Sequence, residues 1–180
     1  MVSWFAELIK ALWILLPAYT ANGLPPFSRG KRPIDFGKKM FDGNRVFGDG
    51  KTIEGLIFGV GSGTLVGVIQ TFLQPHINSY FLNVGFSLPT MTFFVGFMIS
   101  LGALVGDAVA SFVKRRFRLP RGADVPLMDQ WNFVIGLLVF SFWLIEINIY
   151  MILIMLLITP VIHRLANIFA YKLKIKREPW

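Results

Sequence analysis

The feature that most constrains the fold of this chain is the distribution of its lysines and arginines. None of the 18 falls between Thr52 and Val113, and none falls between Gly122 and His163. These two stretches contain long apolar runs, and the whole chain is 54% hydrophobic and only 16% charged, with a mean hydropathy of +0.61. Average soluble domains carry roughly 25% charged residues. Cation-free apolar blocks between basic segments are typical of an integral membrane protein.

The apolar blocks predict five membrane-spanning helices, because one crossing takes about 20 mostly apolar residues. We expect these helices at roughly 3–22, 53–73, 89–113, 127–146 and 149–171. The last two are separated only by a short polar turn at 146–148, and residues 74–88 are expected to form a loop. The prediction is an all-α integral membrane protein of one domain, residues 1–180, with two functional loops at 23–52 and 114–126.

The positive-inside rule predicts the orientation of these helices. Loops 23–52 and 114–126 and the C-terminal tail are basic, whereas segments 74–88 and 146–148 contain no lysine or arginine. Five crossings then place the N-terminus outside the cell (plasma) membrane, and both basic loops and the C-terminus in the cytoplasm. We expect no signal peptide, because Glu7 and Lys10 interrupt the first apolar run.

Composition also excludes several classes of function. The chain contains no cysteine, so it has no disulfide, no thiolate metal site and no cysteine nucleophile. Its net charge of +8 does not indicate nucleic-acid binding, because the cations are confined to the loops and the C-terminal end. We therefore expect membrane lipids, and no nucleic acid, as partners.

An ionisable side chain within an apolar span marks a functional site by default, because its burial in the membrane is costly. Asp107 lies near the end of the third expected span. Ser111 and Lys114 follow at i+4 and i+7, so the three side chains share one helix face. Arg115 and Arg116 continue beyond the membrane edge. The alternative is an intramembrane ion pair or a lysine that extends to the interface.

A second carboxylate, Asp129, follows the basic loop at the start of the fourth expected span, where Pro126 suits the first helical turn. Alone, Asp129 could simply complement the helix dipole. Near Asp107 and cations such as Arg121, it suits a magnesium ion and a polyphosphate. Magnesium is often held by one or two carboxylates and substrate phosphates, and arginine forks bind phosphate oxygens. We therefore predict Asp107 and Asp129 as metal ligands.

The first basic loop contains the stretch FGDGKTIEG, residues 47–55, whose Gly-Lys-Thr resembles the end of a P-loop. The P-loop spacing requires a glycine where Arg45 stands, and no buried strand precedes the stretch. It is better interpreted as a glycine turn that opens a helix, where free amides bind anions. The alternative is a solvated basic loop that serves topology alone. The expected phosphate contacts in this loop are Asp42, Asn44, Arg45, Gly48, Asp49, Gly50, Lys51 and Thr52.

Taken together, these motifs resemble a known family. The segment GDAVASFVKRR followed by PLMDQ resembles the signature of the membrane CTP-dependent cytidylyltransferases, the phosphatidate cytidylyltransferase superfamily. Its matching positions are Ser111, Lys114, Arg115 and Asp129. The loop motifs P-x-D-x-G (33–37), DGNR (42–45) and GDGKT (48–52) are similar to the archaeal branch, the CDP-archaeol synthases. The chain lacks the His-Gly-Gly and Asp-Arg motifs of the longer bacterial enzymes, so catalysis by histidine is not expected, and His163 is interpreted as a packing or interfacial residue.

The resemblance implies that CTP and an archaeal lipid phosphate, 2,3-digeranylgeranylglyceryl phosphate, react to give CDP-archaeol and pyrophosphate in phospholipid biosynthesis. It implies catalytic roles for Asp107, Lys114 and Asp129, with Mg²⁺ on the two carboxylates and CTP as co-substrate. Ser111, Arg115, Arg116 and Arg121 would bind CTP or its phosphates. The glycine turn 48–52 would face the Asp107–Asp129 segment across one shared CTP site.

Two other functions remain open from the sequence. One is a CTP-dependent polyprenol-type lipid kinase, which would release CDP rather than pyrophosphate. The other is a small anion transporter or channel, although no inverted repeat or broken midplane helix is evident. The sequence does not determine the oligomeric state, and a homodimer is one option.

Overall fold

A computed structural model describes residues 3–174 of the chain and consists of helices and loops. The helices are α1 (Trp4–Gly23), α2 (Ile53–Phe81), α3 (Phe93–Arg116), α4 (Met128–Ser141) and α5 (Ile149–Lys172), with short 3-10 turns η1 (Pro25–Ser28) and η2 (Leu82–Val84). Residues 3–174 include two isolated β-bridges, Pro33 with Thr52 and Lys39 with Arg45, and no longer strand. The predicted all-α fold is therefore confirmed.

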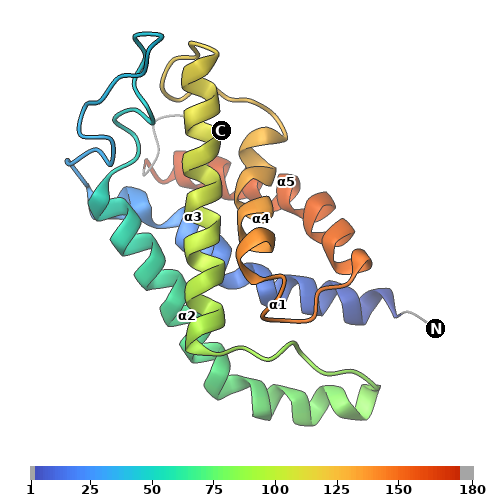
Figure 1. The fold of residues 1–180 in the computed structure, drawn as a ribbon. Coiled ribbons are helices and arrows are strands. Elements are labelled where there is room, and N and C mark those ends of the chain that lie inside the picture. Colours follow the sequence, from blue (N-terminus) through green and yellow to red (C-terminus); the bar gives the residue numbers. More distant parts are fainter. Residues whose placement is uncertain (1–2, 175–180) are drawn as a thin grey trace.

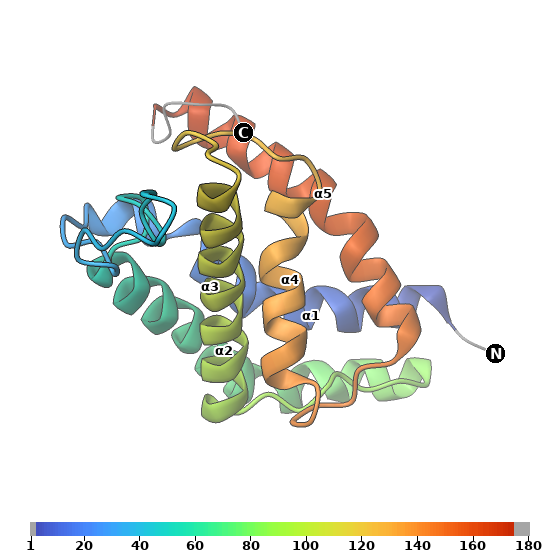
Figure 2. The same cartoon turned by 45° about the horizontal axis from the view of Figure 1, so that its top comes forward.

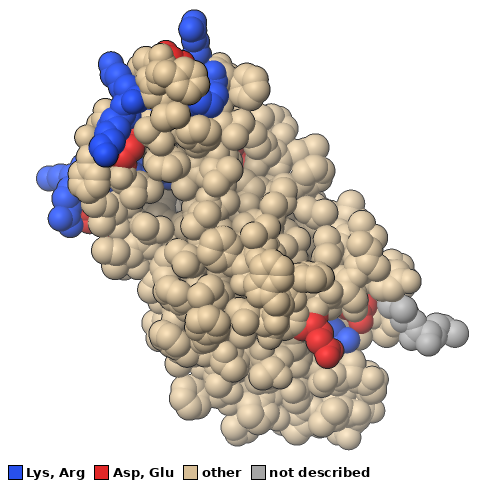
Figure 3. All heavy atoms as spheres, viewed as in Figure 1, with Lys and Arg blue, Asp and Glu red and all other residues tan. Residues whose placement is uncertain are grey.

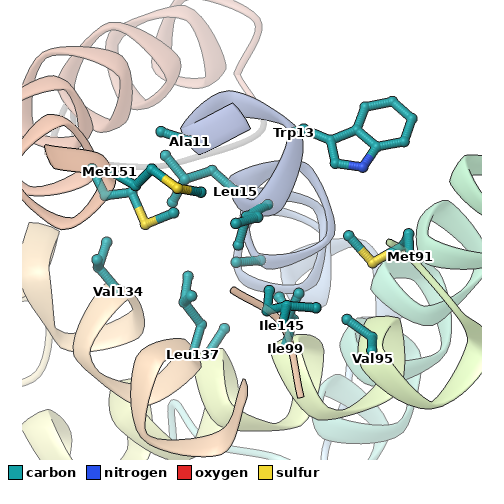
Figure 4. Close-up of a cluster of buried hydrophobic side chains, with 14 of the residues drawn as sticks. Ala11, Trp13, Leu15, Met91, Val95, Ile99, Val134, Leu137, Ile145 and Met151 are labelled. Atoms are coloured by element: carbon teal, nitrogen blue, oxygen red, sulfur yellow. The ribbon is translucent and has the colours of Figure 1, made fainter. Parts of the chain in front are cut away.

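Helix α3 is the centre of the arrangement and packs against α2 on one side and α4 on the other. Helix α1 crosses these helices, and α5 runs obliquely across the molecule beside α1 and α4 (Figures 1 and 2). The hydrophobic core lies where α1 meets the other helices, and it includes Leu15, Ile99, Leu137 and Met151 (Figure 4). All four side chains are at most 2% exposed.

Three of the helical segments described in residues 3–174 are long and apolar enough to cross a membrane. They are Ile53–Val84, Phe93–Arg116 and Ile149–Lys172, with mean hydropathies of 1.7, 1.9 and 2.0. Helix α1 has 20 residues, but Glu7 and Lys10 lower its hydropathy. Helix α4 has only 14 residues. At 1.5 Å per residue it is about 21 Å long, shorter than a hydrocarbon core of about 30 Å.

Glycines bring α3 unusually close to its neighbours. A Cβ atom added to Gly136 of α4 would lie 2.1 Å from the carbonyl oxygen of Gly102, and one added to Gly106 of α3 would lie 2.2 Å from that of Asn132. Small residues at helix interfaces permit such backbone approach in membranes. Gly61 of α2 is different, because nothing lies within 4 Å of its added Cβ.

Helix α2 is longer than the sequence predicts. It continues to Phe81 with Pro75 inside it, whereas residues 74–88 were expected to form a loop. A proline removes one backbone hydrogen bond and bends a helix without necessarily ending it. The last turns of α2 accordingly run at an angle to the rest of the helix (Figure 1). Gln74 stabilises this bend, because its side chain bonds the carbonyl oxygen of Leu88 and the amide of Met91.

Helix α4 is shorter than the expected span 127–146. It begins at Met128, after Leu127 with a positive φ of 66°. The first turn therefore starts beyond Pro126, and the Leu127 amide donates a hydrogen bond to the side-chain oxygen of Gln130. The helix ends at Ser141, so the connection to α5 comprises residues 142–148 rather than 146–148 alone. Asn148 then caps α5 by accepting a hydrogen bond from the Met151 amide.

The charged side chains are segregated along the molecule. In Figure 3, lysines and arginines gather over the loops at one end, and most of the visible surface carries no charge. A small charged group lies at the other end, near the start of α1. There Glu7 pairs with Lys10 at 3.1 Å and also accepts a hydrogen bond from Asn148 at 2.7 Å. Lys176 and Arg177 of the basic tail lie outside the described residues.

Candidate active site

A cavity of about 600 Å³ opens between the first basic loop, the C-terminal end of α3, the start of α4 and the last turns of α5. Both polar and apolar side chains line it. Its polar wall includes Asp49, Lys51, Thr52, Asp107, Ser111, Lys114, Arg115, Arg121 and Asp129, and its apolar wall includes Pro25, Ile34, Leu56, Leu104 and Ala108. The predicted common face of Asp107, Ser111 and Lys114 therefore lies along one cavity.

The glycine turn of the first loop meets α3 inside this cavity. Lys51 Nζ forms an ion pair with Asp107 Oδ2, and Asn132 Nδ2 lies 3.4 Å from Asp107 Oδ1. The hydroxyl oxygen of Thr52 accepts a hydrogen bond from the Gly55 amide at 3.1 Å and so caps α2. Because Thr52 follows Lys51 directly, this cap fixes the backbone beside Lys51. The close approach of Gly106 to the backbone of Asn132 places the amide side chain beside Asp107.

A second ion pair joins α3 to the start of α4. Lys114 Nζ lies 2.5 Å from Asp129 Oδ1 and also donates to the carbonyl oxygen of Ala123 at 2.7 Å. Asp129 Oδ2 accepts the Val125 amide at 3.0 Å, so the carboxylate also orders the end of the second loop. The two predicted metal ligands, Asp107 and Asp129, thus line the same cavity, and each is paired with a lysine.

The glycine turn binds an anion of the protein itself. The buried carboxylate of Asp35 accepts the Phe47 and Gly48 amides at 3.0 and 2.9 Å and the Gly37 amide at 3.1 Å. It also pairs with Arg45 at 2.5 Å. Burial alone would raise the pKa of Asp35, but these hydrogen bonds outweigh it and hold the pKa well below its usual range. The Gly48 amide, expected to contact phosphate, is therefore already bonded to Asp35.

Two of the predicted phosphate contacts, Asp42 and Arg116, line neither this cavity nor the smaller one beside it, and instead join the loop to α3. Arg116 Nη1 pairs with Asp42 Oδ1 at 2.7 Å, and Arg116 Nη2 donates to the carbonyl oxygen of Arg45 at 2.5 Å. The guanidinium also lies 5.0 Å above the Phe112 ring. The hydrogen bond from the Asn44 side chain, together with the charge of Arg116, lowers the pKa of Asp42. Neither Asp42 nor Arg116 is among the cavity-lining residues.

A smaller cavity of about 220 Å³ adjoins the first. Its lining residues are Asn44, Arg45, Gly48, Asp49, Arg115, Arg118, Leu119 and Arg121. Four of them, Gly48, Asp49, Arg115 and Arg121, also line the larger cavity. Asp49 pairs with Arg45 at 2.7 Å. Apart from Asp42 and Arg116, the predicted phosphate contacts therefore divide between two adjoining cavities.

Helix α5 contributes side chains that sequence reasoning did not place at the site. His163 and Asn167 line the larger cavity, and Asn167 Nδ2 lies 3.2 Å from His163 Nδ1. The His163 ring also lies 6.1 Å from that of Phe133. Two polar residues one turn apart in an apolar helix were the signal that could have located them. The sequence predicted His163 as a packing or interfacial residue, and its contact with Phe133 agrees with that. Its position in the lining of the cavity was not predicted.

The chemistry of these side chains fits a magnesium ion that is carried in part by a substrate. Within residues 3–174, no group of three or more Asp, Glu, His or Cys side chains is close enough to hold a metal alone. Asp107 and Asp129 line one cavity, and the nearby Oδ1 of Asn132 is buried without a hydrogen-bond partner in the described structure. Oxygen donors of this kind suit Mg²⁺, which commonly takes its remaining ligands from phosphates and water.

Comparison with known proteins agrees with this site. Residues 5–180 match the family model described as CarS-like, CDP-archaeol synthase. The CDP-archaeol synthase of Pyrococcus abyssi is 48% identical over 174 residues, covering 96% of this chain and 98% of that protein. The one from Methanocaldococcus jannaschii is 44% identical over 174 residues, covering 96% and 97%.

A solved structure, described as an intramembrane enzyme for archaeal membrane lipids biosynthesis, superposes with a TM-score of 0.75. It is 36% identical in sequence, and the match covers 89% of this chain and 94% of that chain. This protein is thus a membrane-embedded protein and belongs to the CDP-archaeol synthase family.

Proposed function

We propose that this chain transfers the cytidylyl group of CTP to 2,3-digeranylgeranylglyceryl phosphate, giving CDP-archaeol and pyrophosphate. The observation that carries the proposal is the meeting of Lys51 with Asp107 and of Lys114 with Asp129 along one cavity. Membership of the CDP-archaeol synthase family supports the same reaction. The cavity is lined by cations that suit a triphosphate and by apolar residues that suit the start of lipid chains.

In this reaction an oxygen of the lipid phosphate attacks the α-phosphorus of CTP. The bond from that phosphorus to the bridging oxygen breaks, and pyrophosphate leaves with the electron pair. The attacking phosphate is already an anion, so no side chain has to remove a proton from it. The protein then contributes mainly positioning and neutralisation of the negative charges that must approach one another.

The cations of the larger cavity would carry out this neutralisation. Lys51 comes from the first loop and Lys114 from α3, and each forms an ion pair with one of the two carboxylates. Arg115 and Arg121 extend the positive charge towards the adjoining cavity. Ser111, one turn after Asp107 on α3, offers a hydroxyl to the substrate within the same cavity. Thr52 and the glycine turn of the first loop hold Lys51 in place.

We propose Asp107 and Asp129 as the residues that hold Mg²⁺, with Asn132 Oδ1 as a further oxygen donor. When bound, Mg²⁺ would neutralise and orient the triphosphate of CTP. The two carboxylates are paired with lysines in this structure. Binding of CTP would let Lys51 and Lys114 turn from the carboxylates to phosphate oxygens, because both sets of oxygens are anionic acceptors. The lysines thereby remain paired throughout the reaction.

An assay of products tests the reaction. Protein purified in detergent is incubated with CTP, magnesium chloride and the lipid phosphate, and pyrophosphate and CDP are both measured. We expect pyrophosphate in an amount equal to the lipid product, and its loss when the metal is removed with EDTA. Release of CDP would instead indicate the lipid kinase. Absence of either product with every lipid phosphate offered would contradict the proposed transfer and favour anion transport.

We also propose that the protein lies in the cell membrane with its N-terminus outside and the cavity on the cytoplasmic side. The clustering of cations at one end of the molecule supports this orientation (Figure 3). The chain has no cysteine, so single cysteines at Ser79 and Lys39 can be labelled without background. A membrane-impermeant reagent applied to intact cells should label position 79 and not position 39. Labelling of position 39 alone would reverse the proposed orientation.

A further inference from the structure

The smaller cavity contains more positive charge than its neighbours in the protein neutralise. Of its arginines, Arg45 is paired with Asp35 and Asp49. Within residues 3–174, Arg115, Arg118 and Arg121 form no ion pair with a carboxylate. Three guanidinium groups thus surround about 220 Å³ of open space, and guanidinium groups are suited to bind the oxygens of a small polyanion.

One of these guanidiniums also has an unsatisfied donor. Arg115 Nη2 donates to the carbonyl oxygen of Pro120 at 3.2 Å, but its Nε is buried and has no hydrogen-bond partner in the described structure. A buried donor without a partner costs free energy, and in native proteins it often indicates a missing ligand or water. Arg115 lines both cavities, so an anion in either one could accept this hydrogen bond.

Arg118 occupies an unusual backbone position. It has a positive φ of 57° at the end of α3, where its amide bonds the carbonyl oxygen of Arg115 and the Leu119 amide bonds that of Lys114. This is the helix-ending motif in which glycine is the preferred residue. An arginine there is less favourable than a glycine, because its Cβ atom is crowded in this backbone conformation. An arginine in place of glycine makes the Arg118 side chain a candidate for a functional role.

The helix dipole alone does not account for Arg118. Cations near the C-terminal end of a helix are stabilising, but Lys114, Arg115 and Arg116 already occupy the last turn of α3. Arg118 lies beyond that turn and lines only the smaller cavity. It therefore serves as a marker that distinguishes the smaller cavity from the larger one.

We infer that the smaller cavity receives the pyrophosphate leaving group as it departs from the larger one. This inference rests on the proposed transfer. When the bond between the α-phosphorus and the bridging oxygen breaks, the electron pair leaves with pyrophosphate. This product concentrates the negative charge of two phosphates in a small volume. Arg115 and Arg121 line both cavities and so remain beside it, and Arg118 binds it only after it has moved. The site would thus govern pyrophosphate release and inhibition by pyrophosphate.

The test replaces Arg118 with glycine, which suits the backbone at that position and should fold at least as well. The Arg118→Lys variant retains the charge but not the guanidinium fork. Lys31→Gln is the matched control, because Lys31 is exposed in the first basic loop, lines neither cavity and removes one positive charge as well. The measurements are the inhibition constant for inorganic pyrophosphate, the KM for CTP, and pyrophosphate binding by calorimetry in the presence of magnesium chloride.

We expect Arg118→Gly to raise the inhibition and binding constants for pyrophosphate about fivefold, the factor of an exposed charged contact worth about 1 kcal/mol. The KM for CTP should change less than about twofold. The pyrophosphate constants of Arg118→Lys should lie between those of the wild type and those of Arg118→Gly. Lys31→Gln should match the wild type in all of these measurements. An unchanged pyrophosphate constant in Arg118→Gly would overturn the inference. An equal rise in the KM for CTP would do so too, because the cavity would then belong to CTP binding.

The calorimetric experiment separates this inference from the proposed function. If the wild type transfers no cytidylyl group but binds pyrophosphate in an Arg118-dependent way, the proposed reaction fails while the anion site stands. If transfer occurs and pyrophosphate binding is indifferent to Arg118, the reaction stands and the smaller cavity has no part in product release.

Discussion

Lys51 and Asp107, which are 56 positions apart in the chain, form an ion pair where the first basic loop meets α3. The side chains are only 23% and 25% exposed, so the pair lies within the cavity rather than on the open surface. The contact joins the glycine turn of the loop to the carboxylate of the membrane helix. It makes the two segments parts of one site.

The Lys51–Asp107 pair provides the most direct test of the site. We expect Asp107→Asn to lower kcat/KM about 100-fold or more, because removing one group that stabilises charge in a transition state typically has such an effect. Lys51→Ala should also lower kcat/KM. Both variants should remain folded, as judged by thermal unfolding in detergent. An Asp107→Asn enzyme with wild-type kcat/KM at the same magnesium concentration would remove this carboxylate from the site.

Exchange of the two charges gives a sharper version of this test. In the double variant Lys51→Asp with Asp107→Lys, the ion pair can re-form with its sign reversed, so we expect the loop to stay docked on α3. The carboxylate would then lie at position 51 and the cation at position 107, the reverse of what the metal and the phosphate need, so activity should stay lost. Recovery of activity in the double variant would show that the pair serves only to hold the loop.

The pair between Asp42 and Arg116 should behave differently, because it lies outside both cavities. We expect Asp42→Asn and Arg116→Gln each to lower the melting temperature, and the double variant to be little worse than either single one, because the two side chains interact directly. The check is a double-mutant cycle on thermal unfolding. Fully additive effects would show that the two side chains stabilise the protein independently.

Asp35 predicts a pH dependence of loop stability. Since its pKa in the folded protein is held well below the ordinary value of about 3.9, its ionised form stabilises the fold at all pH values above that ordinary value. This contribution is lost as the pH falls further, towards the folded-state pKa. At pH 7 we expect Asp35→Asn to lower the melting temperature by about 5–10 °C, as for a broken buried pair.

The difference between wild type and Asp35→Asn should therefore be constant between pH 5 and pH 7 and smaller at pH 3. Thermal unfolding at these three pH values measures it, with Lys31→Gln as a control that should show no such trend. A difference that grows on acidification would mean that Asp35 is not held in its charged form.

The glycines of α3 and α4 offer a matched pair of substitutions. An added methyl at Gly136 would meet the Gly102 carbonyl oxygen at 2.1 Å, whereas one at Gly61 of α2 would meet nothing within 4 Å. We expect Gly136→Ala to separate the helices and lower the melting temperature and the yield of folded protein. Gly61→Ala should be neutral or stabilising by up to about 1 kcal/mol, because alanine is the better helix former. Equal behaviour of the two variants would contradict the close packing of α3 and α4.

The positions of the charges and apolar runs determined much of this protein by themselves. They predicted the all-α membrane fold, because a membrane restricts spanning segments to long apolar helices and confines cations to the connecting loops. The spacing of Asp107, Ser111 and Lys114 also predicted a shared face, because helical periodicity is a local property. The motifs of the two loops indicated the family before any contact between them was known.

Tertiary structure decided what no local pattern could. The bend of α2 at Pro75 and the early end of α4 depend on long-range partners such as the Gln74 hydrogen bonds, so single-segment hydropathy misplaced both boundaries. The glycine turn that resembles a phosphate site is bonded to Asp35, and Arg116 is paired with Asp42, because the fold places these opposite charges in contact. Which cations face a cavity is therefore a result of packing: the sequence supplies the arginines, and the fold decides which of them remain unpaired.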